Sequence, residues 1–156
     1  MKTFAIGLFV CYLCLGEMKE WPKHTICKLN DIEATYQSCD PLQDIGLSIN
    51  PCTINLHEHM NITIAVVLRH DINFLFFRLI ASYNGQKLLT QEVIVCERTL
   101  QAYSFCGKRK GDFVFYHHRL RVEVPPILKG HFNVSLMMFN EDNIIVACAD
   151  LALNIL

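Results

Sequence analysis

Apolar and polar residues alternate with a period of two in several separate segments of this chain. Successive side chains of a β-strand point to opposite faces, so such alternation predicts strands with one buried face. No window keeps a helical period over three turns, and the pattern therefore predicts a chain built from strands. The alternating apolar positions are Ile45, Leu47 and Ile49; Ile62, Ile64, Val66 and Leu68; Leu120, Val122 and Val124; Phe132, Val134, Leu136 and Met138; and Ile145, Ala147, Ala149, Leu151 and Leu153.

Turn signals separate these segments. They are the dipeptides Asn50-Pro51, Asn84-Gly85, Lys110-Gly111 and Lys129-Gly130. Several short strands joined by such turns are typical of antiparallel sheets. We therefore expect an all-β fold, a two-sheet antiparallel β-sandwich whose inner faces meet about 10 Å apart.

The first 16 residues differ from the rest of the chain. Lys2 is followed by a nearly continuous apolar run over residues 4–15, and Gly16 precedes the charged Glu17. This order predicts a signal peptide, residues 1–16, that is cleaved after Gly16. The run is too short to span a bilayer, so we expect no transmembrane segment and a protein secreted into the extracellular space.

The segment 17–156 contains 140 residues, which suits one domain with a core of its own. It carries 13 Lys and Arg against 15 Asp and Glu, a formal charge of −2. A balance so close to neutrality produces no global field for a polyanion, and we expect no nucleic-acid partner. The segment has no internal repeat or low-complexity tract.

Six cysteines follow the predicted leader: Cys27, Cys39, Cys52, Cys96, Cys106 and Cys148. An even number in a secreted chain predicts disulfide bonds, but six cysteines allow 15 pairings and their spacing does not choose among them. The alternation narrows the possible pairings. Cys39 and Cys148 both occupy positions that point away from the apolar face of their strands, so these two cysteines could meet. Cys96 and Cys106 could close a short loop. The close Cys pairs of zinc sites are missing, so we expect no metal.

Two N-x-[S/T] sequons begin at Asn61 and Asn133. Each asparagine lies on the polar parity of its strand, so a glycan there would point away from the buried face. We predict glycosylation at both positions.

The candidate catalytic groups are two short clusters of titratable residues and one aspartate, and none of them matches a known catalytic motif. They are the segment 57–59, with His57, Glu58 and His59, the pair His117-His118, and Asp112. The chain has no nucleophile elbow, no H-E-x-x-H helix and no phosphate-binding loop. We expect a protein that is not an enzyme, with no catalytic residue and no cofactor.

Four motifs resemble the secreted MD-2-related lipid-recognition (ML) family. They are YQSCDPLQD at residues 36–44, NPC at 50–52, YSFCGKRKG at 103–111 and VACA at 146–149. The resemblance covers essentially all of residues 17–156. It implies an immunoglobulin-like sandwich whose sheets are splayed apart around a lipid cavity. It also implies disulfides between Cys27 and Cys52, Cys39 and Cys148, and Cys96 and Cys106.

A filled sandwich core and an open lipid cavity have the same alternating pattern, so periodicity alone supports only a core. The resemblance implies the cavity, which would hold acyl chains because burying each CH₂ is worth about 0.8 kcal/mol. The polar headgroup would stay at the mouth. The implied lipid-binding wall consists of Tyr36, Ile45, Leu47, Ile49, Ile62, Ile64, Val66, Phe77, Leu79, Ala81, Tyr83, Phe132, Val134, Leu136, Leu151 and Leu153.

Two features bear on which lipid would bind. Endotoxin-sensing members of the family carry an extra unpaired cysteine where this chain has Val134, so we expect no free thiol here. A rim near the expected mouth could contact phosphate or could simply be a solvated charged strand face. These features leave direct binding of endotoxin open, and we expect a phospholipid or related two-tailed lipid. The rim residues are His117, His118, Arg119, Arg121 and Lys129.

Phe74, Phe76 and Ile80 lie on the parity opposite to Phe77, so a partner or a loop of the same chain could cover this outer face. One branch of the ML family pairs with a leucine-rich-repeat ectodomain of the Toll-like type, the radioprotective receptor of B cells. That branch modulates innate immune and inflammatory responses to lipopolysaccharide. The resemblance implies a lipid-binding accessory subunit, at the cell surface when bound to such a receptor. The alternatives are a receptor-independent soluble lipid carrier or transfer protein, and a secreted interaction module with a filled core.

Overall fold

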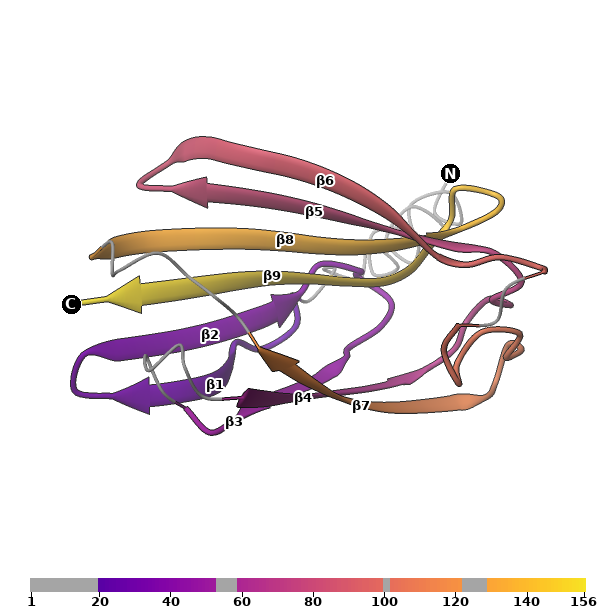
Figure 1. Cartoon of the computed structure of the whole chain (residues 1–156), viewed down its shortest axis with the longest axis horizontal. Coiled ribbons are helices and arrows are strands. Elements are labelled where there is room, and N and C mark those ends of the chain that lie inside the picture. The colour runs from indigo at the N-terminus through magenta and orange to yellow at the C-terminus, as the bar shows by residue number, and fades with distance from the viewer. Residues whose placement is uncertain (1–19, 53–58, 100–101, 122–128) are drawn as a thin grey trace, which may run out of the picture.

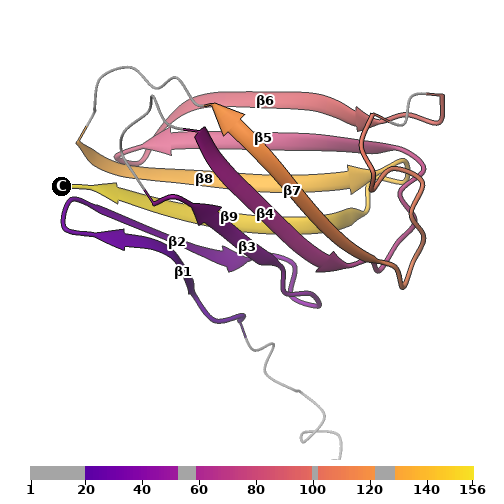
Figure 2. The ribbon, with the colours of Figure 1, turned by 60° about the horizontal axis from the view of Figure 1, so that its bottom comes forward.

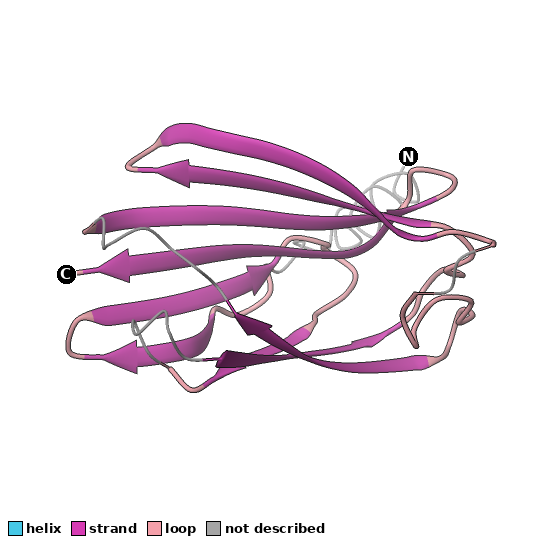
Figure 3. Ribbon diagram, viewed as in Figure 1, coloured by secondary structure: helices cyan, strands magenta, loops and turns pink. Residues whose placement is uncertain are grey.

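The structure is a computed structural model that describes residues 20–52, 59–99, 102–121 and 129–156. These residues contain β-strands in two antiparallel sheets and no helix, which confirms the predicted all-β sandwich (Figures 1 and 3). The strands are β1 (His24–Leu29), β2 (Ile32–Ser38), β3 (Gly46–Asn50), β4 (His59–Val67), β5 (Leu75–Tyr83), β6 (Gln86–Cys96), β7 (Phe113–Arg121), β8 (Gly130–Asn140) and β9 (Ile145–Ile155).

The larger sheet has the strand order β1-β2-β9-β8-β5-β6, and the smaller sheet has the order β3-β4-β7. Figure 2 shows β4 and β7 crossing over the face of the larger sheet. On one side of the sandwich β1 contacts β3. On the other side β6 and β7 are the edge strands of their sheets, and the described residues contain no strand pairing between them. Within the described residues, strands of the two sheets therefore contact each other along one side only.

A cluster of buried residues packs together at one end of the sandwich, at the right of Figure 1. Short hydrogen bonds from the turn after Cys106 close this end, including Leu68 N to Asp112 O at 2.9 Å and Gly107 N to Ile72 O at 2.7 Å. We call it the closed end. Its buried members are Val66, Leu68, Ile72, Leu75, Cys96, Phe105, Cys106, Val114 and Val146.

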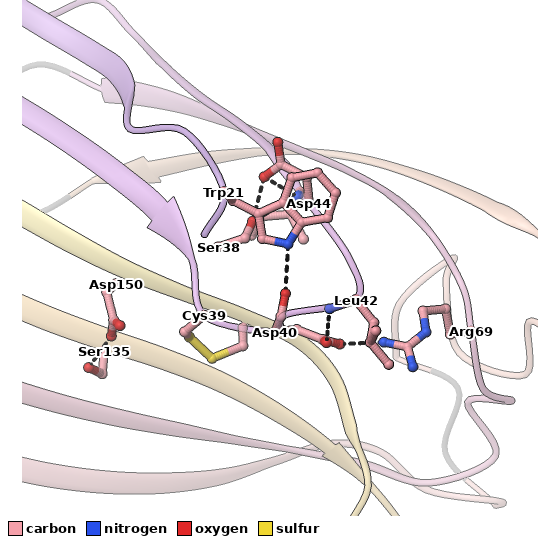
Figure 4. The surroundings of a disulfide bond; sticks show 11 residues. Trp21, Ser38, Cys39, Asp40, Leu42, Asp44, Arg69, Ser135 and Asp150 are labelled. Atoms are coloured by element: carbon pink, nitrogen blue, oxygen red, sulfur yellow. Dashed lines mark hydrogen bonds and ion pairs between the residues drawn. A yellow bond between two sulfur atoms is a disulfide. The ribbon is translucent and has the colours of Figure 1, made fainter. Parts of the chain in front are cut away.

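Three disulfides join Cys27 to Cys52, Cys39 to Cys148 and Cys96 to Cys106, the pairs that the family resemblance implies. The Cys39–Cys148 bond lies at the end of β2 (Figure 4), where the backbone N–H of Cys39 also donates to the carbonyl of Cys148 at 3.2 Å. The Cys96–Cys106 bond lies in the core of the closed end.

The sequence pattern predicted the wrong inward-facing residue at the start of the last strand, β9. A bulge shifts the register of β8 and β9, so that Phe139 pairs with Ile145 whereas Met138 pairs with Ala147. Val146 is the extra residue and turns into the core, where it is 1 % exposed. Ile145, opposite Phe139, therefore leaves the inner parity that the sequence pattern gave it.

Alternation also misplaced or missed strand boundaries. β7 begins at Phe113, well before the expected start near Leu120, because its first residues are aromatic or apolar on both faces. Val122 and Val124 lie outside the described residues. β1 and the first half of β6 had no alternating pattern to predict them. Among the described residues, no helix is long and apolar enough to cross a membrane.

Candidate functional site

The inner face of the smaller sheet is organised in rows across its three strands. Ile49 and Ile62 pair with each other, and Ile62 pairs with His118. The next row contains Leu47, Ile64 and Tyr116. Val66 and Val114 form the row nearest the closed end, beside Ile45, which precedes β3. The β7 members of these rows alternate with outward-facing aromatic and basic residues.

The facing rows of the larger sheet follow from its register. Each row crosses β2, β9, β8 and β5 in turn, and the apolar residues of one parity share the inner face. The row nearest the free strand ends is Ile32, Ile155 and Gly130; the next is Ala34, Leu153, Phe132 and Tyr83; then come Tyr36, Leu151, Val134 and Ala81; then Ser38, Ala149, Leu136 and Leu79; and last Ala147, Met138 and Phe77. Except for Ile45, which precedes β3, all the predicted wall residues therefore lie on the two facing sheet surfaces.

Exposure of these inner residues differs sharply along the sandwich. Val66 and Val114 are buried at the closed end, whereas Ile49, Ile62 and Val134 are only half-buried. On β6 the inner residues Leu89 and Val93 are 45 % and 44 % exposed. We call the part lined by half-buried inner residues the open end. Apolar side chains that face another sheet but keep this much exposed area line a space that they do not fill.

A cavity of about 260 Å³ leads from the closed end to the inner face of β7. Among the predicted wall residues only Ile64 and Val66 line this cavity. Ile45 and Phe77 lie beside the closed end, and the others lie on the same faces nearer the open end. Sequence analysis missed the contribution of β7 and of the 103–105 segment, because neither alternates clearly. The cavity is lined by Ile64, Val66, Leu68, Ile72, Leu75, Val95, Tyr103, Phe105, Val114, Tyr116, His118, Met138, Val146 and Ala147.

Aromatic side chains form one corner of the cavity. The ring of Tyr116 meets those of Phe105 and Tyr103 edge-on, at 5.0 and 5.9 Å between centroids. Burial, together with the nearby Tyr103 hydroxyl, raises the pKa of Tyr116 above its ordinary value. The Tyr116 hydroxyl therefore stays protonated at physiological pH, and it lies 3.1 Å from Nδ1 of His118.

The rim residues predicted from the sequence do not all lie on the same face of the structure. His118 lines the cavity, whereas His117 points to the outer face and pairs with Thr63, with 3.0 Å between Nδ1 and Oγ1. Arg119 lies on the same parity as His117 and pairs with Asn61. Lys129 is exposed, and its carbonyl accepts a hydrogen bond from the Tyr83 hydroxyl at 2.7 Å.

The joined side of the sandwich is held by polar contacts beside Tyr36. The Tyr36 hydroxyl donates to the Ile45 carbonyl at 2.9 Å, and Asp44 accepts from Ser38 at 2.6 Å. Asp44 also lies 2.9 Å from Nε2 of His24. Burial acts to raise the pKa of Asp44, but the hydrogen bonds from Ser38 and His24 outweigh it and lower that pKa.

Figure 4 shows the other polar contacts around the Cys39–Cys148 bond. The Arg69 guanidinium lies 2.8 Å from Oδ2 of Asp40, and the Trp21 indole N–H donates to the Asp40 carbonyl at 2.8 Å. These contacts fix the loop between β2 and β3. The same loop carries Asp44 to the joined side of the sandwich.

The outer faces carry the remaining predicted features. Asn133 is exposed and Asn61 is half-buried, both on the outward parity. Phe76 stacks on Phe139 with 4.9 Å between centroids, and the Arg78 guanidinium lies 5.1 Å from the Phe139 ring. Neighbours in the same sheet therefore cover part of the outer apolar face. The described residues contain no group of three His, Cys, Asp or Glu side chains that could hold a metal ion, and His57 lies outside them.

Comparison with known proteins agrees with this architecture. The ML domain family matches residues 27–155. Lymphocyte antigen 86 of Mus musculus is 37 % identical over 135 residues, which cover 86 % of this chain and 83 % of the relative. Lymphocyte antigen 86 of Homo sapiens is 36 % identical over 156 residues, which cover 96 % of each protein.

A solved structure, chicken MD-1 complexed with lipid IVa, has a TM-score of 0.78 and 34 % identity to this chain, covering 87 % of it and 99 % of the chicken chain. The family match and these relatives also support the expectation that the chain is not an enzyme. Because the family match spans residues 27–155 and the human relative aligns over nearly its whole length, the chain belongs to the ML-domain family.

Proposed function

We propose that the chain is a secreted, lipid-binding accessory subunit of a Toll-like leucine-rich-repeat receptor, which modulates innate immune responses to lipopolysaccharide. In this proposal residues 1–16 are removed as a signal peptide, and residues 17–156 are the mature ML domain. The acyl chains of a phospholipid or related two-tailed lipid lie between the sheets, against the predicted wall residues. The receptor-bound protein is at the cell surface.

The observation that carries the proposal is the half-exposed apolar inner surface of the open end. A protein interior normally packs to the density of an organic crystal, and large apolar surfaces without a partner are costly in water. Leu89 and Val134 face inward yet keep solvent access. An acyl chain would cover such a surface. The solved chicken relative, described as complexed with lipid IVa, supports lipid binding by a protein of this fold.

Substitution of a wall residue tests the lipid site. Val134 lies on the inner face between Leu151 and Ala81, so Val134→Trp should fill space that lipid would occupy and lower the bound lipid to a small fraction of the parent's. The thermal midpoint should change little, because an open space accepts volume that a packed core does not. Lipid is measured by mass spectrometry of organic extracts from gently purified protein.

The matched control is Ala152→Trp, which adds the same ring in the neighbouring strand on the outer face, where Ala152 is exposed. It should keep both lipid and stability. A parent protein without extractable lipid, together with a Val134→Trp variant that unfolds, would contradict the lipid-binding proposal and support the filled-core alternative. N-terminal sequencing of the secreted protein should begin at Glu17.

Co-purification tests the receptor half of the proposal. The secreted parent should be retained by an immobilised Toll-like leucine-rich-repeat ectodomain of the radioprotective type. Lipid content with no retention would instead support the runner-up, a receptor-independent lipid carrier. The resemblance to the receptor-pairing branch of the family favours the accessory subunit.

A further inference from the structure

We propose that His118, oriented by Tyr116, is the hydrogen-bond donor that binds an oxyanion headgroup, a carboxylate or a phosphate, of a lipid held in the cavity. This inference rests on the proposed lipid-binding function and deepens it. It assigns a headgroup contact to one side chain of the β7 wall and a positioning role to another.

The cavity lining is apolar except at one corner. Among the described residues that line it, only Tyr103, Tyr116 and His118 have side chains with nitrogen or hydroxyl groups. Tyr103 is 39 % exposed and His118 is exposed as well, whereas Tyr116 is half-buried behind them. The polar corner is therefore where the cavity meets solvent. A lipid whose chain lies along the apolar lining would place its headgroup at such a corner.

The contact between Tyr116 and His118 determines what this corner offers a ligand. Their rings stack with 5.8 Å between centroids and 11° between planes, and the hydroxyl lies 3.1 Å from Nδ1. When the hydroxyl donates to Nδ1, the neutral imidazole carries its proton on Nε2. Nε2–H is then a donor available to an acceptor at the cavity mouth. An oxyanion is the best such acceptor, because hydrogen bonds to charged groups are the stronger ones.

His118 and its neighbour His117 lie on opposite faces of β7, and only His118 belongs to a row of the inner face. Ile49 and Ile62 are the other members of that row, so a ligand at His118 would touch apolar side chains on the adjacent strands. His117, one residue earlier, lies on the opposite face and is engaged by Thr63. The two histidines have the same chemistry, but only one lines the cavity.

Three single-chain amphiphiles of equal chain length test the assignment. Palmitate carries a carboxylate, hexadecyl phosphate carries a phosphate, and hexadecyl methyl ether carries neither. Each is titrated into delipidated, full-length secreted protein and followed by native mass spectrometry. The parent should bind at least one of the two anions more tightly than the ether, and the preferred anion identifies the headgroup chemistry.

His118→Leu should weaken binding of the preferred anion about tenfold, the effect of losing one hydrogen bond to a charged group, and change ether binding less than about twofold. Tyr116→Phe keeps the ring and should weaken the anion about threefold. Without the tyrosine hydroxyl, His118 should no longer be held in one tautomer, and the imidazole ¹H–¹⁵N spectrum should no longer show the proton on Nε2 alone. If Tyr116 had only a structural role, this spectrum would not change. His117→Leu is the matched control and should leave all three affinities unchanged.

Equal weakening of all three amphiphiles by His118→Leu would overturn the inference, because the imidazole would then be only part of the apolar wall. An unchanged anion affinity, or an equal loss in His117→Leu, would overturn it as well. A parent that binds none of the three amphiphiles would overturn the inference, whereas the lipid extracted from gently purified parent tests the proposed lipid-binding function separately.

Discussion

The two ends of the sandwich are built from the same strands but are packed differently. At the closed end, Leu68, Leu75 and Val146 are at most 2 % exposed, and a disulfide and the 107–112 turn cover them. At the open end, inner residues such as Val134 and Leu153 are half-buried. The densest packing is therefore at the closed end, whereas the half-buried inner residues of the open end keep part of their apolar surface accessible.

A similar contrast separates the two long sides. On the joined side, the Cys27–Cys52 bond, Tyr36 and Asp44 hold the sheets together. On the other side β6 and β7 are edges, and β6 is exposed over nearly its whole length. A sandwich closed on one side and at one end can admit a long apolar ligand without unfolding.

Removal of the long-range disulfide should have the largest effect. Cys39 and Cys148 are 109 residues apart, so replacing both with Ser should cost about 4 to 5 kcal/mol in the chain-entropy model. Replacing Cys96 and Cys106, 10 residues apart at the closed end, should cost about 3 kcal/mol. Denaturant unfolding and the amount secreted measure both variants. Equal losses would mean that local strain outweighs loop length.

Truncation of one leucine at each end should sharpen the comparison. Leu75→Ala removes a side chain that is 1 % exposed and should cost about 3 kcal/mol, including the cavity left behind. Leu153→Ala, on a half-buried inner row, should cost about 1 kcal/mol in lipid-free protein, because less area returns to water. The free energy of unfolding in denaturant distinguishes them, and similar costs would show that the open end is packed as densely as the closed end.

The joined side should respond to acid. Because the pKa of Asp44 is lowered in the folded protein, its contribution to stability is present above its ordinary value of 3.8 and is lost as the pH falls through the lowered value. Asp44→Asn should therefore cost about 1 to 2 kcal/mol at pH 7 and flatten the acid side of the stability profile. Thermal midpoints across pH 2 to 7 measure this, with the parent as reference. An unchanged profile would mean that this carboxylate does not hold the joined side.

Glycan removal should have the smallest effect. Asn61 and Asn133 lie on outward parities, so Gln at either position should remove one glycan mass and leave lipid content unchanged. Stability should change by less than about 0.5 kcal/mol. Intact mass spectrometry before and after enzymatic release of N-glycans checks occupancy. Lipid loss in either variant would place that asparagine near the cavity rather than on the outer face.

Local pattern was enough to predict which face of most strands is buried. Val134, Leu136, Leu151 and Leu153 lie on the inner face as their alternation predicts, because a strand's side-chain period of two does not depend on what the strand packs against. The motifs around Cys39, Cys52 and Cys106 were specific enough to indicate the ML family, and with it a sandwich splayed around a cavity.

Other features depended on contacts that alternation does not encode. The bulge that turns Val146 inward arises from the register between β8 and β9, and one extra residue there reverses the local parity. β7 was predicted only from Leu120 onward, because Phe113 and Phe115 are apolar yet face outward. The separation of His118 from His117 likewise required the pairing of β4 with β7.

The sequence by itself therefore determined the strands' buried faces, the even set of cysteines and the family, since these follow from local period and motif. Only the tertiary structure decided which part of the inner surface is filled. Core and cavity walls use the same apolar residues, and they differ in the distance between the sheets. That distance depends on the Cys39–Cys148 disulfide, on the turns of the closed end and on the lack of pairing between β6 and β7, and local sequence pattern does not encode these relations between distant segments.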